Sequence, residues 1–215
     1  MPIIHRMEQR TEAWHAVRIG IPTASSFDQL ITPAGKPSGQ SRKYLYRLVA
    51  ERLLKRPLGS GVATPAMLQG VQREPDARDQ FALSQHVNLE LVGFITTDDA
   101  KLGCSPDAII KGRSEGLEIK CPTPPVHVGY MLDGPDQAYK AQVQGQMLIC
   151  DFDRLHFYSY STELPPVHKI MTRDETYIGT LRTMLDEFTD ELAAETIRAE
   201  RMGEEWWRNF RPEDE

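Results

Sequence analysis

The chain has 215 residues, of which 40% are hydrophobic, and it carries a formal net charge of −6 at pH 7. A chain of this length can bury one full hydrophobic core, and it has no apolar run of transmembrane length and no signal-peptide pattern, so we expect a single cytoplasmic domain over residues 1–215. The negative charge argues against binding nucleic acid through a broad basic surface, although it is compatible with a local basic groove.

Two short helices are predicted near the N-terminus, and each carries a polar side chain near one of its ends. Thr11 is a suitable N-cap for a helix that ends near Gly20, and Arg18 lies toward its end. From its position alone, Arg18 is a cation near the helix C-terminus, where the helix dipole favours positive charge. Ser25 lies where the second helix begins, and its hydroxyl either caps that helix or contacts phosphate.

The next segments supply cations and one carboxylate. Residues 33–41 are rich in Gly, Pro and Ser and are predicted to form a loop. Arg42 and Lys43 follow this loop, and they either contact a DNA backbone or remain solvated. Two helices are then predicted, over residues 44–55 and 65–86. In the second helix Glu74 stands four residues before Arg78, a spacing that favours a salt bridge on the helix surface.

A predicted β-hairpin is the central feature of the chain. A strand-rich segment over residues 87–97 leads through a turn to two β-like runs, 107–111 and 116–120, which flank a turn rich in Gly and Ser. Side chains in a strand alternate between faces, so Glu118 and Lys120 point the same way while the apolar residues between them point into a core. The hairpin can therefore bring Asp107 opposite Glu118 and Lys120.

Two carboxylates and one ammonium group on a single face are suited to binding a divalent cation. Close carboxylates repel each other and raise one pKa, and a cation removes that conflict. Hard oxygen ligands suit Mg²⁺, which keeps several waters and leaves coordination places for a phosphate. Lys120 would then orient an attacking water or stabilise charge on the phosphate. The alternative is an exposed hairpin with a surface salt bridge between Glu118 and Lys120.

The remainder of the chain alternates between helices and strands. A short helix over 129–133 is followed by a helix from Asp136 to Cys150, strands over 154–161 and 167–171, and a long helix over 173–207. The last helix ends in Trp206 and Trp207, which contact either a partner protein or the core. This order predicts the α/β class, with a central mixed β-sheet flanked by helices. The three cysteines form no C-x-x-C pair, and we expect them to be reduced and mostly buried.

Several short motifs occur in an order that is typical of one nuclease family. Pro106-Asp107, followed by Glu118-Ile119-Lys120, resembles the core of PD-(D/E)xK nucleases. More closely, the chain resembles the bacteriophage lambda exonuclease family, also called the YqaJ viral recombinase family. The resemblance covers most of the chain and rests on an ordered set of motifs: Gln9 to His15 with Arg18, Thr23-Ala24-Ser25, Gly70 with Glu74, Gly103 to Asp107, Leu117 to Pro122, and Gln142 to Met147.

This resemblance implies a restriction-endonuclease-like core and a Mg²⁺-dependent exonuclease. Such an enzyme digests one strand of double-stranded DNA from a 5′-phosphorylated end in the 5′→3′ direction. Its products are mononucleotides and a 3′ single-stranded overhang that serves recombination. Family members form ring-shaped homotrimers and work with a single-strand annealing protein, so the resemblance implies a phage or prophage protein with those partners.

The resemblance also implies roles for individual residues. One or two Mg²⁺ ions, or Mn²⁺ in their place, would be held by Asp107, Glu118 and the carbonyl of Ile119, with Lys120 orienting the water. Glu74 and Gln142 would face the metal, with Gln144 as the reserve for Gln142. The 5′-phosphate would be held by Arg18, Ser25 and Ser105. Further DNA contacts would come from Arg42, Lys43 and Met67, the last as an apolar wedge between strand ends.

Three other functions use the same core. A structure-specific or restriction-type endonuclease would also cut closed circular duplex. A non-catalytic module that only binds DNA ends would have no need for the combination of Asp107, Glu118 and Lys120. A small-molecule phosphoesterase would cut free nucleotides rather than DNA.

Overall fold

The computed structural model describes residues 1–59, 65–135 and 137–209, apart from the side chains of residues 66, 67 and 207–209. The larger of its two sheets has five strands in the order β2-β5-β6-β7-β8. Their bounds are β2 (Leu89–Glu90), β5 (Ala108–Ile110), β6 (Glu115–Lys120), β7 (Arg154–Ser159) and β8 (Val167–Thr172). The pair β6 and β7 is parallel and the other neighbours are antiparallel, so the sheet is mixed, as the sequence predicted.

A smaller sheet contains β1 (Ile3–His5), β3 (Phe94–Thr96) and β4 (Gly103–Cys104). The segment 87–97, predicted as one strand-rich run, is therefore divided, with β2 in the large sheet and β3 in the small one. Gly93 lies at this crossing, where a Cβ atom would stand 2.4 Å from the carbonyl oxygen of Met7. The approach of the N-terminal chain thus requires a glycine and separates the two strands.

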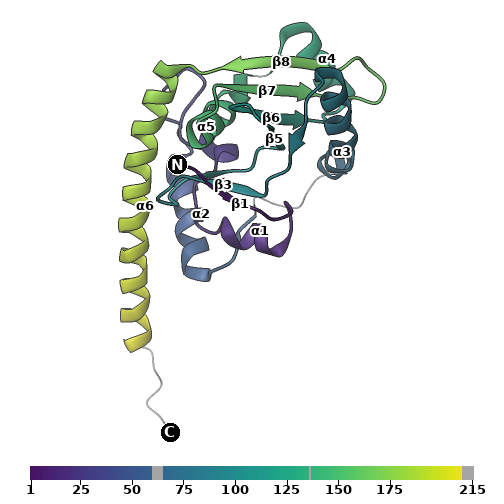
Figure 1. Ribbon diagram of the computed structural model, residues 1–215. Helices are drawn as coiled ribbons and strands as arrows, with labels where there is room; N and C mark the ends of the chain where they lie inside the picture. The colour runs from purple at the N-terminus through teal and green to yellow at the C-terminus, as the bar shows by residue number, and fades with distance from the viewer. Residues whose placement is uncertain (60–64, 136, 210–215) are drawn as a thin grey trace.

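Helices cover both faces of the large sheet (Figure 1), and the alternation of side chains in β6 separates apolar from polar contacts. On one face Leu117 and Ile119 pack in a buried cluster with Phe81 of α3 (Pro65–Gln85). On the other face Glu118 and Lys120 meet α5 (Lys140–Cys150). Helix α5 therefore covers the polar face of β6.

The second predicted helix is the 3₁₀-helix η1 (Ala24–Gln29), and it packs directly on α5. Gly145 of α5 permits this contact, because a Cβ atom there would stand 2.4 Å from the ring of Phe27. Helix α1 (Glu12–Val17) precedes it, and the Thr11 side chain accepts a hydrogen bond from the Trp14 N–H as the expected N-cap. These contacts carry Arg18 and Ser25 toward the polar face of β6.

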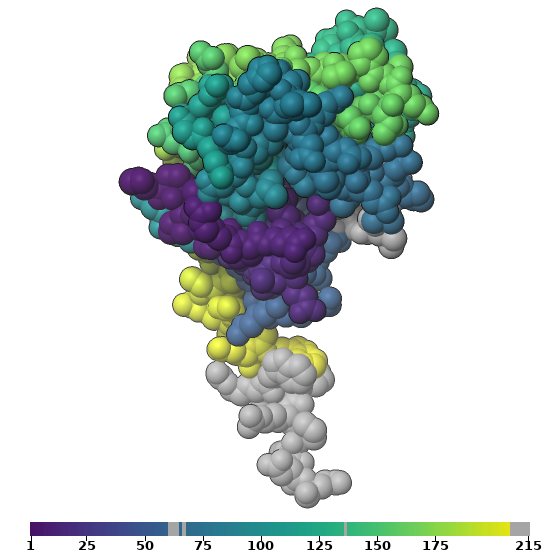
Figure 2. All heavy atoms as spheres, turned by 45° about the vertical axis from the view of Figure 1, so that its right-hand side comes forward, coloured from purple at the N-terminus to yellow at the C-terminus, as the bar shows by residue number. Residues whose placement is uncertain are grey.

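Helix α2 (Ser41–Leu54) packs against α6 (Glu175–Asn209), where the rings of Tyr44 and Phe188 stack with centroids 5.4 Å apart. Arg42 and Lys43 lie in the first turn of α2, which begins earlier than the predicted start at residue 44. The last described turns of α6 project beyond the rest of the molecule (Figures 1 and 2). Within the described residues, no helix combines the length and apolar content needed to span a bilayer.

The segment after β6 differs from its prediction. Helix α4 (Pro124–Asp133) begins five residues before the predicted start at 129, because Pro124 occupies the first helical position, where its missing N–H costs no hydrogen bond. The predicted cap Asp136 lies outside the described residues, and α5 begins only after the 3₁₀-helix η2 (Gln137–Tyr139). The three cysteines are free thiols; Cys104 and Cys150 are buried and Cys121 is partly buried.

Candidate active site

The β5–β6 hairpin sets the geometry of the two central carboxylates. Ala108 pairs with Leu117, so the next residues along each strand, Asp107 and Glu118, lie opposite each other. The Asp107 N–H donates to the Leu117 carbonyl at 2.9 Å, and the Ile119 N–H donates to Asp107 Oδ2 at 2.6 Å. The hairpin therefore fixes the main chain of Asp107 and one of its carboxylate oxygens.

Glu118 is buried, with 4% of its surface exposed, and three side chains donate hydrogen bonds to it. Lys120 Nζ and Gln142 Nε2 each lie 2.6 Å from Glu118 Oε1. Gln146 Nε2 lies 2.7 Å from Glu118 Oε2. Gln142 and Gln146 project from the same face of α5, because four residues span about one helical turn.

Burial and charge change the acid–base properties of this group of residues. Burial, followed by the negative charge of Glu118, raises the pKa of Asp107 from its usual 3.8 to about 8. Burial alone would lower the pKa of Lys120, but the charge of Glu118 and the hydrogen bond to it outweigh burial and raise that pKa above its ordinary value. Lys120 is therefore a cation at neutral pH, while the carboxyl group of Asp107 holds a proton unless another positive charge is nearby.

Glu74 on α3 faces the same site and is bound by an arginine from the N-terminal segment. Arg10 donates two hydrogen bonds to its two carboxylate oxygens, at 2.6 and 3.0 Å, and Arg78 lies 4.0 Å away at the i,i+4 spacing. Arg10 has a positive φ of 68°, which is uncommon for a residue other than glycine. Gln9 holds this backbone in place by donating to the carbonyls of Val92 and Pro106, both at 3.0 Å.

A second group of side chains surrounds Ser105, two residues before Asp107. Arg18 Nη1 and Trp14 Nε1 both donate to Ser105 Oγ, at 2.9 and 3.0 Å. The guanidinium carbon of Arg18 lies 3.9 Å from the centroid of the Trp14 ring, so the indole fixes the plane of the cation. Burial lowers the pKa of Arg18 to about 10, which leaves it charged at neutral pH. This arrangement presents an oriented guanidinium beside a hydroxyl group.

A cavity of about 200 Å³ joins the two groups. Its lining includes nine residues proposed from the sequence: Arg18, Ser25, Glu74, Ser105, Asp107, Glu118, Ile119, Lys120 and Gln142. Gln144 points elsewhere, because its amide binds the Thr172 carbonyl and the Asp174 N–H, each at 2.9 Å. Gln142, and not its reserve Gln144, therefore faces the cavity.

Two other residues proposed from the sequence, Arg42 and Lys43, do not line this cavity. Arg42 forms ion pairs with Glu191 and Glu195 of α6. Lys43 lies on the exposed surface of α2 next to it. The side chain of Met67 lies outside the part of the chain that the structure describes.

Four further residues that were not predicted from the sequence to belong to the site also line the cavity: Gln9, Arg10, Trp14 and Gln146. Gln146 was detectable, because it follows Gln142 by four residues on the same helix face. Its Oε1 atom is buried and, among the described residues, has no hydrogen-bond partner. Trp14 is only half-buried, and its indole N–H donates a hydrogen bond to Ser105 Oγ.

The donor set fits a hard divalent cation. Asp107 and Glu118 offer carboxylate oxygens to one cavity, and a cation there would relieve the repulsion that raises the pKa of Asp107. Within the described residues, no three Asp, Glu, His or Cys side chains cluster as metal ligands. Further ligands would therefore come from a main-chain carbonyl and from water, which Mg²⁺ commonly retains.

Comparisons with known proteins give concordant results. Residues 13–153 match the family model of the YqaJ-like viral recombinase domain. The structure is similar to an alkaline exonuclease (LHK-Exo) from Laribacter hongkongensis, with a TM-score of 0.82 and 28% identity over 91% of this chain and 100% of that chain. LHK-Exo in complex with dAMP matches with the same TM-score and coverage and 29% identity.

A phage-related exonuclease from Haemophilus somnus shares the fold, with a TM-score of 0.61 and 16% identity over 81% of this chain and 96% of that chain. No curated protein matches the chain in sequence.

Proposed function

The chain belongs to the family of YqaJ-like viral recombinase domains, and we propose that it is a Mg²⁺-dependent 5′→3′ exonuclease for double-stranded DNA. It digests one strand of linear duplex from a 5′-phosphorylated end, releases mononucleotides and leaves a 3′ single-stranded overhang for phage-type recombination. The observation that supports this proposal most directly is that both groups of side chains line one cavity. The groups are Asp107, Glu118 and Lys120, and Arg18, Ser25 and Ser105. The similarity to an alkaline exonuclease also supports the proposal.

Asp107, Glu118 and the Ile119 carbonyl would hold one or two Mg²⁺ ions, or Mn²⁺ in their place. When bound, Mg²⁺ polarises a phosphate oxygen and lowers the pKa of water. Lys120 Nζ, fixed 2.6 Å from Glu118, orients the attacking water and stabilises the charge that develops on the phosphate. Gln142 lies 2.6 Å from the same Glu118 oxygen and keeps the carboxylate aligned.

Recognition of the DNA end rests on the second group of residues. Arg18 supplies a planar cation whose N–H groups match the oxygens of a terminal 5′-phosphate. The hydroxyls of Ser25 and Ser105 add donors. Because this group lies beside the carboxylates in one cavity, binding of the terminal phosphate sets which bond is cut and makes each product one nucleotide long. LHK-Exo has been crystallised with the mononucleotide dAMP, which supports this product.

In this proposal the protein stays on DNA because it assembles into a ring around the duplex, and not because of its overall charge. A chain with a net charge of −6 has little capacity to hold DNA through many phosphate contacts. A homotrimeric ring would enclose the duplex, and a single-strand annealing protein would receive the 3′ overhang. Arg42 and Lys43 would contact the DNA backbone, although the ion pairs of Arg42 with α6 weaken its contribution. Met67, on the helix that carries Glu74, would separate the strand ends.

The experiment compares linear duplexes that carry 5′-phosphate or 5′-hydroxyl ends, in Mg²⁺ and in chelator, with closed circular duplex as a third substrate. The proposal predicts digestion of the phosphorylated linear duplex in Mg²⁺ and an intact circle. Cleavage of the circle would indicate an endonuclease, and binding without digestion would indicate an end-binding module. Hydrolysis of free nucleotides without DNA digestion would indicate a small-molecule phosphoesterase.

A further inference from the structure

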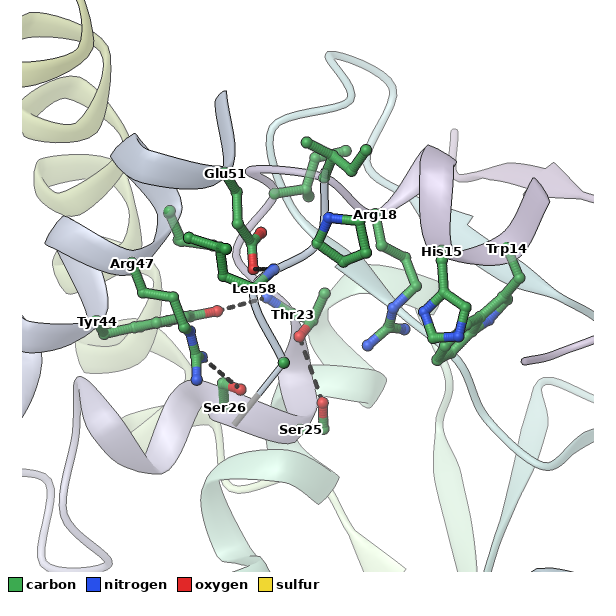
Figure 3. Close-up of a pocket in the computed structure, with 15 residues that line it drawn as sticks. Trp14, His15, Arg18, Thr23, Ser25, Ser26, Tyr44, Arg47, Glu51 and Leu58 are labelled. Carbon is green, nitrogen blue, oxygen red and sulfur yellow. Dashed lines mark hydrogen bonds between the residues drawn. The ribbon is translucent and has the colours of Figure 1, made fainter. Parts of the chain in front are cut away.

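A second cavity, of about 270 Å³, shares Trp14, Arg18 and Ser25 with the candidate active site (Figure 3). Its other lining residues come from α1 and the segment after it, from η1, and from α2 and the segment after α2. The guanidinium of Arg18 and the hydroxyl of Ser25 therefore stand between two spaces. One space leads to Asp107 and Glu118, and the other leads away from them toward α2.

Arg47 of α2 also lines this second cavity, and Thr23 lies between Arg47 and Arg18 in the view of Figure 3. Its guanidinium carbon stands 4.8 Å from the centroid of the Tyr44 ring, and its Nη2 lies 3.5 Å from Ser26 Oγ. Arg47 forms no ion pair with any described carboxylate, whereas Arg42 on the same helix pairs with Glu191. The cavity thus contains a guanidinium whose charge no described side chain neutralises.

The same cavity also contains the carboxylate of Glu51, which forms no ion pair with Arg47. Glu51 is buried, and its two oxygens accept the main-chain N–H groups of Gly20 and Leu58, at 3.0 and 3.1 Å. Its charge is therefore stabilised by the backbone. The lining presents two guanidinium groups, from Arg18 and Arg47, and one carboxylate that is already bound.

We propose that the second cavity is a subsite for the additional phosphates of a 5′-diphosphate or 5′-triphosphate end, with Arg47 as their cation. This inference rests on the proposed function, in which Arg18, Ser25 and Ser105 bind the first 5′-phosphate. The DNA strand then runs from that phosphate toward Asp107, so the space toward Arg47 lies beyond the strand end. A monophosphate end leaves the space to water, and a polyphosphate end extends into it.

The chemistry of the contacts agrees with this assignment. A guanidinium binds phosphate oxygens through two parallel N–H groups, and the Ser26 hydroxyl adds a donor 3.5 Å from Arg47. The bond that is hydrolysed stays the same, the one between the first and second nucleotides, and water supplies the atoms that complete both products. The first product from a triphosphate end is therefore a nucleoside 5′-triphosphate instead of a monophosphate.

The test uses duplexes of one sequence with 5′-triphosphate, 5′-monophosphate or 5′-hydroxyl ends, and measures the rate of digestion and the first product released. The wild-type protein should digest triphosphate ends faster than hydroxyl ends and release a nucleoside triphosphate. Arg47→Gln should lower the ratio of the triphosphate rate to the monophosphate rate by about tenfold or more, because it removes charge-assisted hydrogen bonds. Arg47→Lys, which keeps the charge but loses the planar fork, should restore part of the ratio.

Arg182→Gln is the matched control, because it removes the same charge from an exposed position on α6. Its rate ratio should equal that of the wild type. Triphosphate ends that are digested no faster than hydroxyl ends, while monophosphate ends are digested, would overturn the subsite and leave the proposed function intact. An equal effect of Arg47→Gln on triphosphate and monophosphate ends would also overturn it. A protein that digests none of the three duplexes would overturn both proposals.

Discussion

Asp107 and Glu118 face each other across the β5–β6 hairpin, yet they are held by different kinds of donor. Glu118 accepts hydrogen bonds from the Lys120 ammonium group and from two glutamine amides, whereas Asp107 is hydrogen-bonded to the main chain of its own hairpin. The positive charge of Lys120 therefore balances Glu118 more closely than Asp107. Burial and the charge of Glu118 raise the pKa of Asp107 to about 8, so a cation beside Asp107 would favour its ionised form.

The first prediction concerns the stability of the metal-free protein with Asp107→Asn. Burial and Glu118 raise the folded-state pKa of Asp107 to about 8 from an ordinary value of 3.8, so the folded chain binds this proton more tightly than the unfolded chain. The contribution to stability is complete below about pH 4 and is lost as the pH rises toward about 8. In chelator, the Tm of Asp107→Asn minus the Tm of the wild type should therefore be larger at pH 8.5 than at pH 5.5.

The same variant should lose catalysis. Loss of a residue that only hydrogen-bonds to a metal ligand typically lowers activity by about 10- to 100-fold. Loss of a residue that binds the metal directly should therefore lower activity by more than about 100-fold. Added Mg²⁺ should raise the Tm of the wild type and leave that of Asp107→Asn unchanged. A Tm difference that is the same at both pH values would contradict the charge account, and strong cleavage by the variant in excess Mg²⁺ would contradict the metal role.

The second prediction concerns Arg18→Lys. The variant keeps the positive charge but loses the planar group that stacks on Trp14 and binds Ser105. The ratio of digestion rates on 5′-phosphate and 5′-hydroxyl ends should fall by about tenfold or more, because charge-assisted hydrogen bonds to the terminal phosphate are lost. Arg113→Gln, at an exposed position in the hairpin turn, is the control. Arg18 would be only a general DNA contact if both substrates slowed by the same factor.

The third prediction contrasts two glutamines of α5. Gln142→Ala should slow cleavage with little loss of stability, because its side chain faces the cavity and contacts Glu118. Gln144→Ala should lower the free energy of unfolding by about 1–3 kcal/mol, because the Thr172 carbonyl and the Asp174 N–H lose their partner. Urea unfolding and single-turnover kinetics on both variants measure the two effects. The opposite pattern would transfer the site role to Gln144.

The fourth prediction concerns retention on DNA. Loading of a homotrimeric ring on DNA ends should weaken as salt rises, because phosphate contacts release counterions. The length digested per loading event should fall much less, because an enclosed duplex cannot leave sideways. Single-turnover digestion of long duplex with a trap for free enzyme measures both quantities, and light scattering gives the mass. A monomeric mass, or a run length that falls as steeply as loading, would contradict the ring.

Local patterns explain why the hairpin could be predicted from sequence. The alternation around Glu118 and the Gly- and Ser-rich turn depend only on neighbouring residues, and they define the register that places Asp107 opposite it. The choice between Gln142 and Gln144 was also available from helix periodicity. Gln142 and Gln146 lie one turn apart on one face, and Gln144 lies on the opposite face.

Contacts between distant segments explain what the sequence could not show. Arg10 binds Glu74 across 64 residues, and the Trp14 N–H reaches Ser105 across 91. No periodicity in the chain encodes such pairs, so the sequence did not reveal the contact between Trp14 and Ser105. The division of residues 87–97 between two sheets likewise depends on the approach of Met7 to Gly93.

The most direct measurement follows the first product released from a linear duplex whose 5′-phosphate is labelled at one end. The proposed function requires the terminal phosphate to bind at Arg18, Ser25 and Ser105, one nucleotide from the bond cut beside Asp107 and Glu118. It predicts that in Mg²⁺ the label appears first as a 5′-mononucleotide, and that chelator prevents its release. Labelled oligonucleotides as the first product, or label released as free phosphate, would contradict this arrangement of the site.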